Sequence, residues 1–462
     1  MARPHASILA CAALLGLAVP AAAADGVATV ADRTGLAVTI TQDGTALVRD
    51  RREATLAKGA QALVFEGVAG QATGVGSLSG AGVRVDEQGF DPGGIEAGSL
   101  LRAAVGREVT VVWSDGTAPA REERAVVLAA GPLPVFQVAG RVVAGQPARI
   151  HYDALPQDMR PLAAYRAAIS AEAAGRRPLD LVYQTLGLGW SAETVAELPA
   201  AGDGVTLSVW AAVANHSGID LPRARLQLVA GETNRVADAP PPRALMKVQA
   251  AAAMAPEAAR EALGPYHLYT VAQPVSLRDG ETRQVPLVAP VAVAAERRLV
   301  LDPVPPYAWR QPWTEGPALH PAAQLELRNT SGVPLPGGTV RVVQRGADGG
   351  VRLLGEDRLP ATPAGATARI TLGKAFDLTA RRSQVDFQKV SAEVSEAAFE
   401  IKLANAAAKA ETVTVREAFG GDWLVVDESA KHAKENAFTA RWTVTVPAKG
   451  EVVLKYRVRV KG

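Results

Sequence analysis

Three aromatic residues in a proline-rich stretch have the side chains best suited to binding. Tyr307, Trp309 and Trp313 lie among several prolines within Val304–Pro317. Because proline stiffens the backbone and cannot donate to a central strand, we expect a connector there. Flat rings with a polar edge can stack on sugars at partly hydrated sites. The alternative, which we favour, is that the rings fill the seam between two sandwiches.

A stripe of positive charge near the C-terminus is the second binding candidate. Four cations alternate with four apolar residues, in the order Leu454, Lys455, Tyr456, Arg457, Val458, Arg459, Val460, Lys461. In a strand this alternation places all four charges on one face. That face could hold anionic envelope polysaccharide or lipid headgroups through charge-assisted contacts. The alternative, which we favour, is an edge strand whose cations deter pairing with another sheet.

Catalytic motifs are missing from the sequence. Gly189-Trp190-Ser191-Ala192 is followed by Glu193, so the nucleophile elbow G-x-S-x-G is incomplete. The motifs S-x-x-K, H-E-x-x-H, G-x-x-x-x-G-K-[ST] and the calcium loop are also absent. We therefore do not expect an enzyme, and we expect no cofactor. A hydrolase whose acidic site is defined only by geometry stays open, because the chain has 47 acids.

The histidines and tryptophans favour structural roles. His151, His216, His267, His320 and His432 are scattered without metal-ligand spacing, so we expect no metal site. Four tryptophans fall in or beside expected strands, which predicts core or interface anchors; these are Trp190, Trp210, Trp423 and Trp442.

The first 24 residues have the pattern of a signal peptide. Arg3 supplies the positive end, Ala6–Val19 is apolar, and Ala21–Ala24 is a small-residue cleavage site. The apolar run is too short for a membrane span, which needs about 18 residues or more. Cleavage after Ala24 would remove Cys11, the one cysteine of the chain. We therefore expect a periplasmic or secreted bacterial protein without thiols or a transmembrane span. The alternative is a lipoprotein modified at Cys11.

The overall composition disfavours generic electrostatic partners. The chain has 462 residues and a formal net charge of +2, so no global field attracts nucleic acid or a membrane surface. At roughly 150 residues per domain, this length suggests about three domains.

Short strands separated by turns predict an all-β protein. The dipeptide Asp-Gly, typical of hairpins, recurs at positions 43, 115, 203, 279 and 348. Between these turns lie stretches rich in β-branched residues: Val109–Trp113, Val205–Val213, Arg223–Val229, Gly338–Val343, Arg369–Leu372, Thr412–Arg416, Phe438–Val446 and Glu451–Val460. This spacing favours two or three antiparallel, immunoglobulin-like sandwiches in series.

The predicted division follows the changes in composition. We expect a signal peptide at 1–24, an N-terminal β domain at 25–152, a middle β region at 153–372 and a C-terminal sandwich at 373–462. Residues 239–263 are rich in proline and then alanine. They predict an exposed insertion with one short helix at Pro256–Leu263, ended by Gly264-Pro265.

Several ordered blocks resemble a family of exported bacterial proteins. Their order matches a domain-of-unknown-function family related to the mucoidy inhibitor A proteins. The blocks are Leu186-Gly187-Leu188-Gly189-Trp190-Ser191-Ala192, Asn215-His216-Ser217-Gly218, Tyr266-His267-Leu268-Tyr269-Thr270, Leu335-Pro336-Gly337-Gly338-Thr339-Val340-Arg341-Val342 and Gly421-Asp422-Trp423. Thr194 departs from the tyrosine usual in that family. The resemblance implies a multi-domain β protein of the bacterial envelope and supplies no catalytic residue.

Two function classes follow from the sequence. We favour a non-enzymatic envelope protein, an interaction module that contacts polysaccharide or protein partners. The alternative is a periplasmic hydrolase acting on glycans or peptides.

Overall fold

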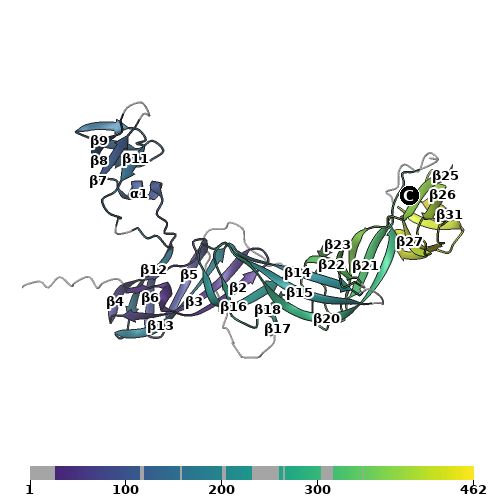
Figure 1. Cartoon of the computed structure of the whole chain (residues 1–462), viewed down its shortest axis with the longest axis horizontal. Helices are drawn as coiled ribbons and strands as arrows, with labels where there is room; N and C mark the ends of the chain where they lie inside the picture. The colour runs from purple at the N-terminus through teal and green to yellow at the C-terminus, as the bar shows by residue number, and fades with distance from the viewer. Residues whose placement is uncertain are drawn as a thin grey trace, which may run out of the picture. The chain divides into compact units, whose positions relative to one another are not determined.

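The structure is a computed structural model that describes most of the chain beyond residue 25. The described residues are 26–114, 119–156, 159–199, 204–231, 260–263, 266–302, 316–346 and 348–461. They form 31 β-strands, one α-helix and one short 3-10 helix (Figure 1). The all-β prediction is therefore confirmed at the level of fold class.

The chain divides into two compact units. The first consists of residues up to Ala37, Leu47–Leu186 and Ser217–Ile219, and the second of Val38–Ala46, Gly187–His216 and Asp220–Gly462. The predicted boundaries near residues 152 and 372 stay predictions.

The first unit contains a sheet of strands in the order β1-β4-β12-β6-β5-β13-β3. β1 and β4 pair in parallel. The pairs β4–β12, β12–β6, β6–β5 and β5–β13 are antiparallel. The bounds are β1 Gly26–Ala28, β3 Thr45–Leu56, β4 Gly59–Glu66, β5 Ala72–Gly80, β6 Val83–Asp91, β12 Ala164–Ala171 and β13 Gly175–Leu186, with the 3-10 helix at Val30–Asp32.

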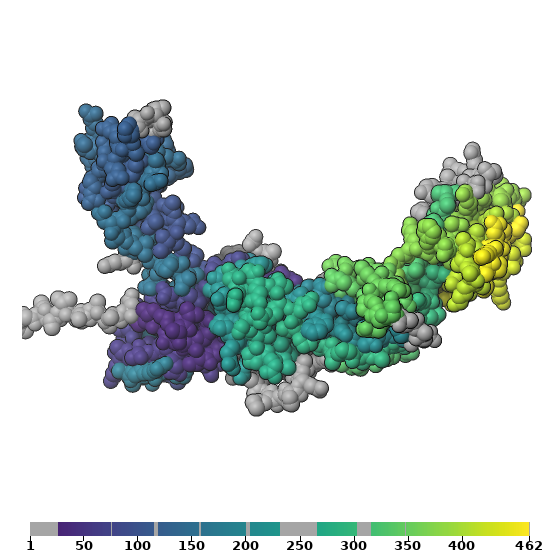
Figure 2. All heavy atoms as spheres, in the orientation of Figure 1, coloured from purple at the N-terminus to yellow at the C-terminus, as the bar shows by residue number. Residues whose placement is uncertain are grey.

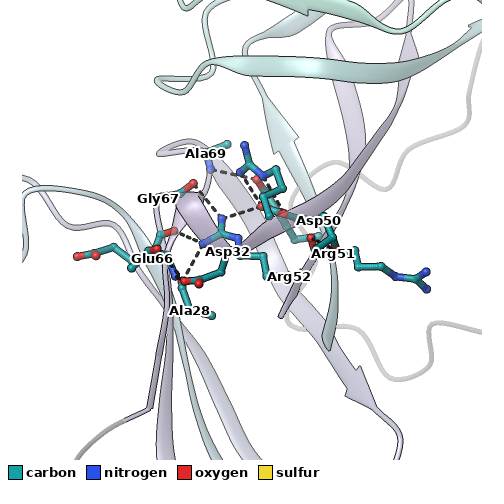
Figure 3. Close-up of polar contacts among 12 residues, drawn as sticks. Ala28, Asp32, Asp50, Arg51, Arg52, Glu66, Gly67 and Ala69 are labelled. Carbon is teal, nitrogen blue, oxygen red and sulfur yellow. Dashed lines mark hydrogen bonds and ion pairs between the residues drawn. The ribbon is translucent and has the colours of Figure 1, made fainter. Parts of the chain in front are cut away.

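A buried arginine ties the N-terminal strand of this sheet to its neighbours. Figure 3 shows the Arg52 guanidinium pointing toward Asp50 and toward the carbonyl oxygens of Ala28, Glu66 and Gly67. Arg52 and Asp50 are both fully buried, with 2.7 Å between Nη2 and Oδ2. Because a buried charge needs partners, these contacts hold β1, β3 and β4 in register.

A separate small sheet in the first unit has its own core. Its strands follow the order β10-β9-β8-β7-β11. Leu101 and Ala104, at the end of α1, pack with apolar residues of β7, β8 and β9. The bounds are α1 Ala97–Ala103, β7 Glu108–Trp113, β8 Arg121–Ala129, β9 Val135–Val138, β10 Arg141–Ala144 and β11 Arg149–His151.

The first segment of the second unit, Val38–Ala46, contains the turn at Asp43-Gly44. Gly44 has a φ of +86°, and the Asp43 carboxylate accepts a hydrogen bond from the Thr45 amide, which explains the hairpin signal. β2 pairs with β16, which is followed in the sheet by β18 and β17, and β19 also pairs with β16. The bounds are β2 Arg33–Thr41, β16 Leu221–Ala230, β17 Arg260–Leu263, β18 Tyr266–Thr270 and β19 Val275–Leu277.

Two local predictions are wrong in this region. Arg260–Leu263 is strand β17 and not the end of a helix. It pairs antiparallel with β18, and the hydrogen bonds of this pairing outweigh a weak local preference for helix. Residues 239–259, the rest of the predicted insertion, lie outside the described residues.

The second wrong prediction is the hairpin at Asp279-Gly280. Gly280 does form a turn, but β19 and β20 pair with different strands and make no hairpin.

The largest sheet of the second unit has the order β23-β22-β14-β15-β20-β27-β30-β29, and β21 pairs with β20 and β24. β20 is 20 residues long, so one end pairs with β15 and the other with β21 and β27 (Figure 1). The bounds are β14 Leu188–Leu198, β15 Val205–Asn215, β20 Thr282–Leu301, β21 Ala322–Arg328, β22 Gly338–Arg345, β23 Val351–Leu359, β24 Thr367–Lys374, β27 Glu411–Ala418, β29 Ala433–Asn436 and β30 Thr439–Val446.

A four-stranded sheet shares a core with the end of the largest sheet. Its order is β25-β26-β31-β28, and its bounds are β25 Leu378–Lys389, β26 Val394–Asn405, β28 Asp422–Glu428 and β31 Gly450–Lys461. Apolar residues of both sheets form one buried cluster that includes Phe399, Val415, Trp442 and Tyr456. Within this core Arg382 makes two hydrogen bonds to Glu417, at 2.9 and 3.0 Å.

Candidate functional site

A hollow lined with charged side chains lies on the second unit. Its volume is about 150 Å³. The side chains come from six strands of the largest sheet, and residues in this part of the chain are drawn green to yellow in Figure 2. They are Arg298, Val300 and Asp302 from the end of β20, Gln324 and Glu326 from β21, Arg369 from β24, Thr414 and Arg416 from β27, Glu435 from β29 and Arg441 from β30.

Strand alternation explains why these residues meet. Leu299 and Leu301 of β20, with Val413 and Val415 of β27, belong to or pack against the apolar core. Their neighbours in sequence must therefore face the other way. The register then aligns the outer residues across the sheet, with Arg298 opposite Gln324, Val300 opposite Thr414, Glu326 opposite Arg369 and Arg416 opposite Arg441.

Arginine dominates the lining. The lining residues comprise four guanidinium groups and three carboxylates, a formal charge of +1 within the lining itself. Guanidinium is a planar donor that matches carboxylate and phosphate geometry, and it stays charged at any physiological pH. The charge balance therefore favours an anionic ligand.

Arg416 is the most firmly held of the four arginines. Its Nε and Nη2 both lie 3.0 Å from the Glu435 carboxylate, and its Nη1 lies 2.9 Å from Asp302. Partial burial opposes the charge of Arg416, but the hydrogen bonds and charges of Glu435 and Asp302 outweigh it and raise its pKa. Arg416 thus positions the two acids, and its positive charge is balanced by theirs.

Arg298 and Arg369 share one acid on the opposite side of the hollow. Arg298 lies 2.8 Å from Glu326 and 2.9 Å from Glu296, while Arg369 lies 3.5 Å from Glu326. The hydrogen bond to Glu296 is the main cause that raises the pKa of Arg298. All three acids of the lining are therefore counter-charges of arginines.

Arg441 differs from the other arginines of the hollow. It is exposed, and it makes no ion pair with any residue in the described part of the chain. Its register neighbour Arg416 already uses Asp302 and Glu435. Arg441 therefore supplies the positive charge that is open to a ligand.

The geometry does not gather metal ligands. No cluster of three or more His, Cys, Asp or Glu side chains with the geometry of a metal site occurs within the described ranges.

The cationic stripe lies in β31, whose position differs from the one we favoured. β31 pairs with β26 on one side and β28 on the other, so the edge-strand interpretation is wrong. The local sequence could not reveal this, because the partner strands β26 and β28 come from other parts of the chain. Three of the cations pair with carboxylates of β26 and β25: Lys455 lies 2.8 Å from Glu400, Arg457 lies 2.7 Å from Asp386, and Arg459 lies 2.6 Å from Glu396.

Lys461 completes the stripe at the end of β31 and is exposed. An anionic polymer bound to the stripe would compete with the ion pairs of the other three cations. The aromatic candidates Tyr307, Trp309 and Trp313 lie outside the described residues, as do Ala24 and Cys11.

The prediction of core or interface positions is confirmed for three tryptophans, which lie in the core, and for Trp210 only the core alternative is excluded. Trp190, Trp423 and Trp442 are buried. Trp210 is 39% exposed, because it occupies an outward position of β15 between the inward residues Val209 and Ala211.

Sequence reasoning missed the hollow itself. The available signal was that several expected strands each carry an arginine directly after an apolar or small residue, as at Arg369, Arg416 and Arg441. That signal is common on solvent-facing strands, and only the pairing of distant strands distinguishes a site from a surface.

The fold and the hollow define an all-β protein of several sheets with an arginine-lined surface site. Residues 179–461 match the model of the family described as "Domain of unknown function (DUF4139)". This match covers more than half of the chain, which therefore belongs to that family. None of the curated proteins matches the chain. No helix within the described ranges combines the length and apolar character required to cross a bilayer.

Proposed function

We propose that this protein is an exported, non-enzymatic component of the bacterial cell envelope that binds an acidic polysaccharide. The arginine-lined hollow carries the proposal, because its excess positive charge lies on an exposed residue, Arg441. A uronate carboxylate is planar and fits the donor geometry of a guanidinium group. Export is supported by the leader at 1–24 with its small-residue end at Ala24.

Binding is better supported than hydrolysis. A glycosidase needs two carboxyl groups free to act as acid and as base or nucleophile. In the hollow, each of Asp302, Glu326 and Glu435 is engaged with an arginine. The acids therefore serve to orient the donors that would receive an anion.

Two finer points belong to the same proposal. The relation to mucoidy inhibitor A rests on the ordered blocks quoted from the sequence and agrees with a surface-polysaccharide ligand. The immunoglobulin-like character of the C-terminal sandwich is supported by the two sheets that share one core. The stripe of Lys455, Arg457, Arg459 and Lys461 is a secondary contact for the same polymer.

The test compares one charge inside the hollow with one outside it. We expect Arg441→Gln to raise the Kd for a polyuronate about tenfold or more, since a hydrogen bond to a charged group contributes about 1.5–3 kcal/mol. The matched control is Arg225→Gln, which removes the charge of another exposed arginine, on β16. Calorimetry at two salt concentrations, with a neutral dextran as reference polymer, measures the difference.

Three results would contradict the proposal. They are equal losses in the two variants, equal binding of polyuronate and dextran, or release of reducing ends from the polyuronate by the purified protein. The last of these would favour the hydrolase instead.

A further inference from the structure

Trp210 is an exposed aromatic residue in the interior of a sheet. β15 lies between β14 and β20, so Trp210 has strand neighbours on both sides. Even so, 39% of the residue is accessible to solvent, against 5% for Trp190 on the adjacent strand. An exposed tryptophan leaves a large apolar ring in contact with water, and tryptophan is enriched at interfaces where one end of the side chain is apolar and the other is wet.

The surroundings of Trp210 leave its ring accessible. On β15 the next residues on the same face are Ser208 and Ala212, which are both small. Across the sheet, Trp210 is opposite Glu193 of β14 on one side and Pro286 of β20 on the other. No aromatic ring of the described chain stacks on it. Small neighbours leave part of the indole ring uncovered, so the exposed 39% of Trp210 is available to a ligand.

Polar groups lie beside the ring in a fixed arrangement. The Glu193 carboxylate accepts a hydrogen bond of 2.6 Å from Arg341 Nη1, and Arg341 Nε lies 2.7 Å from Glu356. The side chain of Glu193 is 18% exposed and that of Arg341 is 44% exposed. These ion pairs hold hydrogen-bonding groups next to an apolar face, and the pKa of Arg341 is raised mainly by its hydrogen bond to Glu193.

The register aligns these features in a row across four strands. Pro286, Trp210, Glu193 and Thr339 are successive cross-strand partners in β20, β15, β14 and β22. With about 4.8 Å between neighbouring strands, the row spans roughly 14 Å. A row of this length on the face of a sheet suits an extended oligosaccharide better than a single small molecule.

We infer that Trp210 and its row form a platform for a neutral, extended hexopyranose chain. One sugar ring stacks its C–H face on the indole, and Glu193 and Arg341 hydrogen-bond the hydroxyl groups of the next ring. A protein partner is less well matched, because it needs about 800 Å² of surface on each side and the apolar part of this site is one ring between small and charged residues. The inference deepens the proposed function and rests on it: it assigns neutral rings of an envelope glycan to a site separate from the hollow.

The experiment measures binding of cellohexaose and N-acetylchitohexaose to the exported chain by calorimetry. We expect Trp210→Ala to weaken binding about tenfold or more, whereas Trp210→Phe retains most of it because a ring is preserved. Glu193→Gln should weaken binding less. Because Trp210 faces outward, its variants should keep the circular dichroism spectrum of the native protein. Arg225→Gln, which removes an exposed charge on β16, should leave the binding of these neutral sugars unchanged.

The outcomes separate this inference from the proposed function. If the polyuronate binds but neither neutral hexasaccharide does, the platform is refuted and the hollow stands. If the hexasaccharides bind Trp210→Ala as well as the native chain, the platform is again refuted. If neither type of sugar binds, both are refuted. A protein that co-purifies with the native chain but not with Trp210→Ala, in the absence of sugar binding, would assign the ring to a protein interface.

Discussion

At the scale of single residues, charge pairing decides what each arginine does. Arg52 is completely buried, and its Nη1 and Nη2 groups donate to Asp50 and three carbonyl groups, so its role is structural. Arg416 is saturated by two acids and orients them. Arg441, exposed in the hollow, makes no ion pair within the described part of the chain. All three residues are arginines, so their different roles come from the groups that surround each side chain.

The buried arginine gives a stability prediction. Arg52→Met leaves three carbonyl oxygens without their donor, so we expect the first unit to lose about 3–5 kcal/mol of unfolding free energy. The control, Arg51→Met, changes a neighbour that is 47% exposed and paired with Asp180, and should cost about 1 kcal/mol or less. Hydrogen exchange of the amides in β3 and β4 measures the opening free energy of this unit. Similar losses in both variants would contradict the structural role of Arg52.

At the scale of elements, close backbone approach shapes the sheet that carries Trp210. β22 runs parallel to β14, and Gly338 lies opposite Ala192. A Cβ atom at Gly338 would overlap the carbonyl oxygen of Ala192. The requirement for glycine therefore comes from the neighbouring backbone and not from a turn. This pairing also places Thr339 and Arg341 beside Glu193.

The glycine of β22 can be tested directly. Gly338→Ala should destabilise the pairing of β14 and β22 by about 1–3 kcal/mol, because the backbone must shift. Gly89→Ala in β6 is the matched control, since a Cβ there meets nothing within 4 Å. Amide exchange in β14 reports the difference. Unchanged protection in Gly338→Ala would show that the strands can separate without cost.

At the scale of the whole molecule, the family match and the division of the chain agree. The matched residues 179–461 contain nearly all of the second unit, which holds both the hollow and the row of Trp210. The first unit lies largely outside the match and has separate cores of its own. We therefore assign the proposed binding to the second unit.

The proposed signal peptide at residues 1–24 gives a prediction that can be tested on the mature chain. Cleavage after Ala24 would yield a mature chain that starts at Asp25 and contains no cysteine. Mass spectrometry of the protein purified from its native envelope should find this N-terminus and no reaction with thiol reagents. A lipid-modified Cys11 at the N-terminus would show instead that the chain is a lipoprotein.

The sequence by itself determined the class of fold and most strands. Alternating β-branched segments such as Thr412–Arg416 and Glu451–Val460 became β27 and β31, because the two-residue period of a strand is a local property. The hairpin at Asp43-Gly44 was equally local, since positive φ is allowed to glycine. The helix expected at Pro256–Leu263 is not formed at Arg260–Leu263, because these residues pair with β18 as strand β17.

Only the tertiary structure decided which side chains meet and which are free. The hollow joins Arg298, Glu326 and Arg441 from strands up to 143 residues apart. Likewise, Arg457 and Arg459 are paired because β25 and β26 bring acids to them. Trp210 is exposed because its strand turns Val209 and Ala211 inward. Alternation predicts that neighbours face opposite sides, but long-range pairing determines what lies on each side.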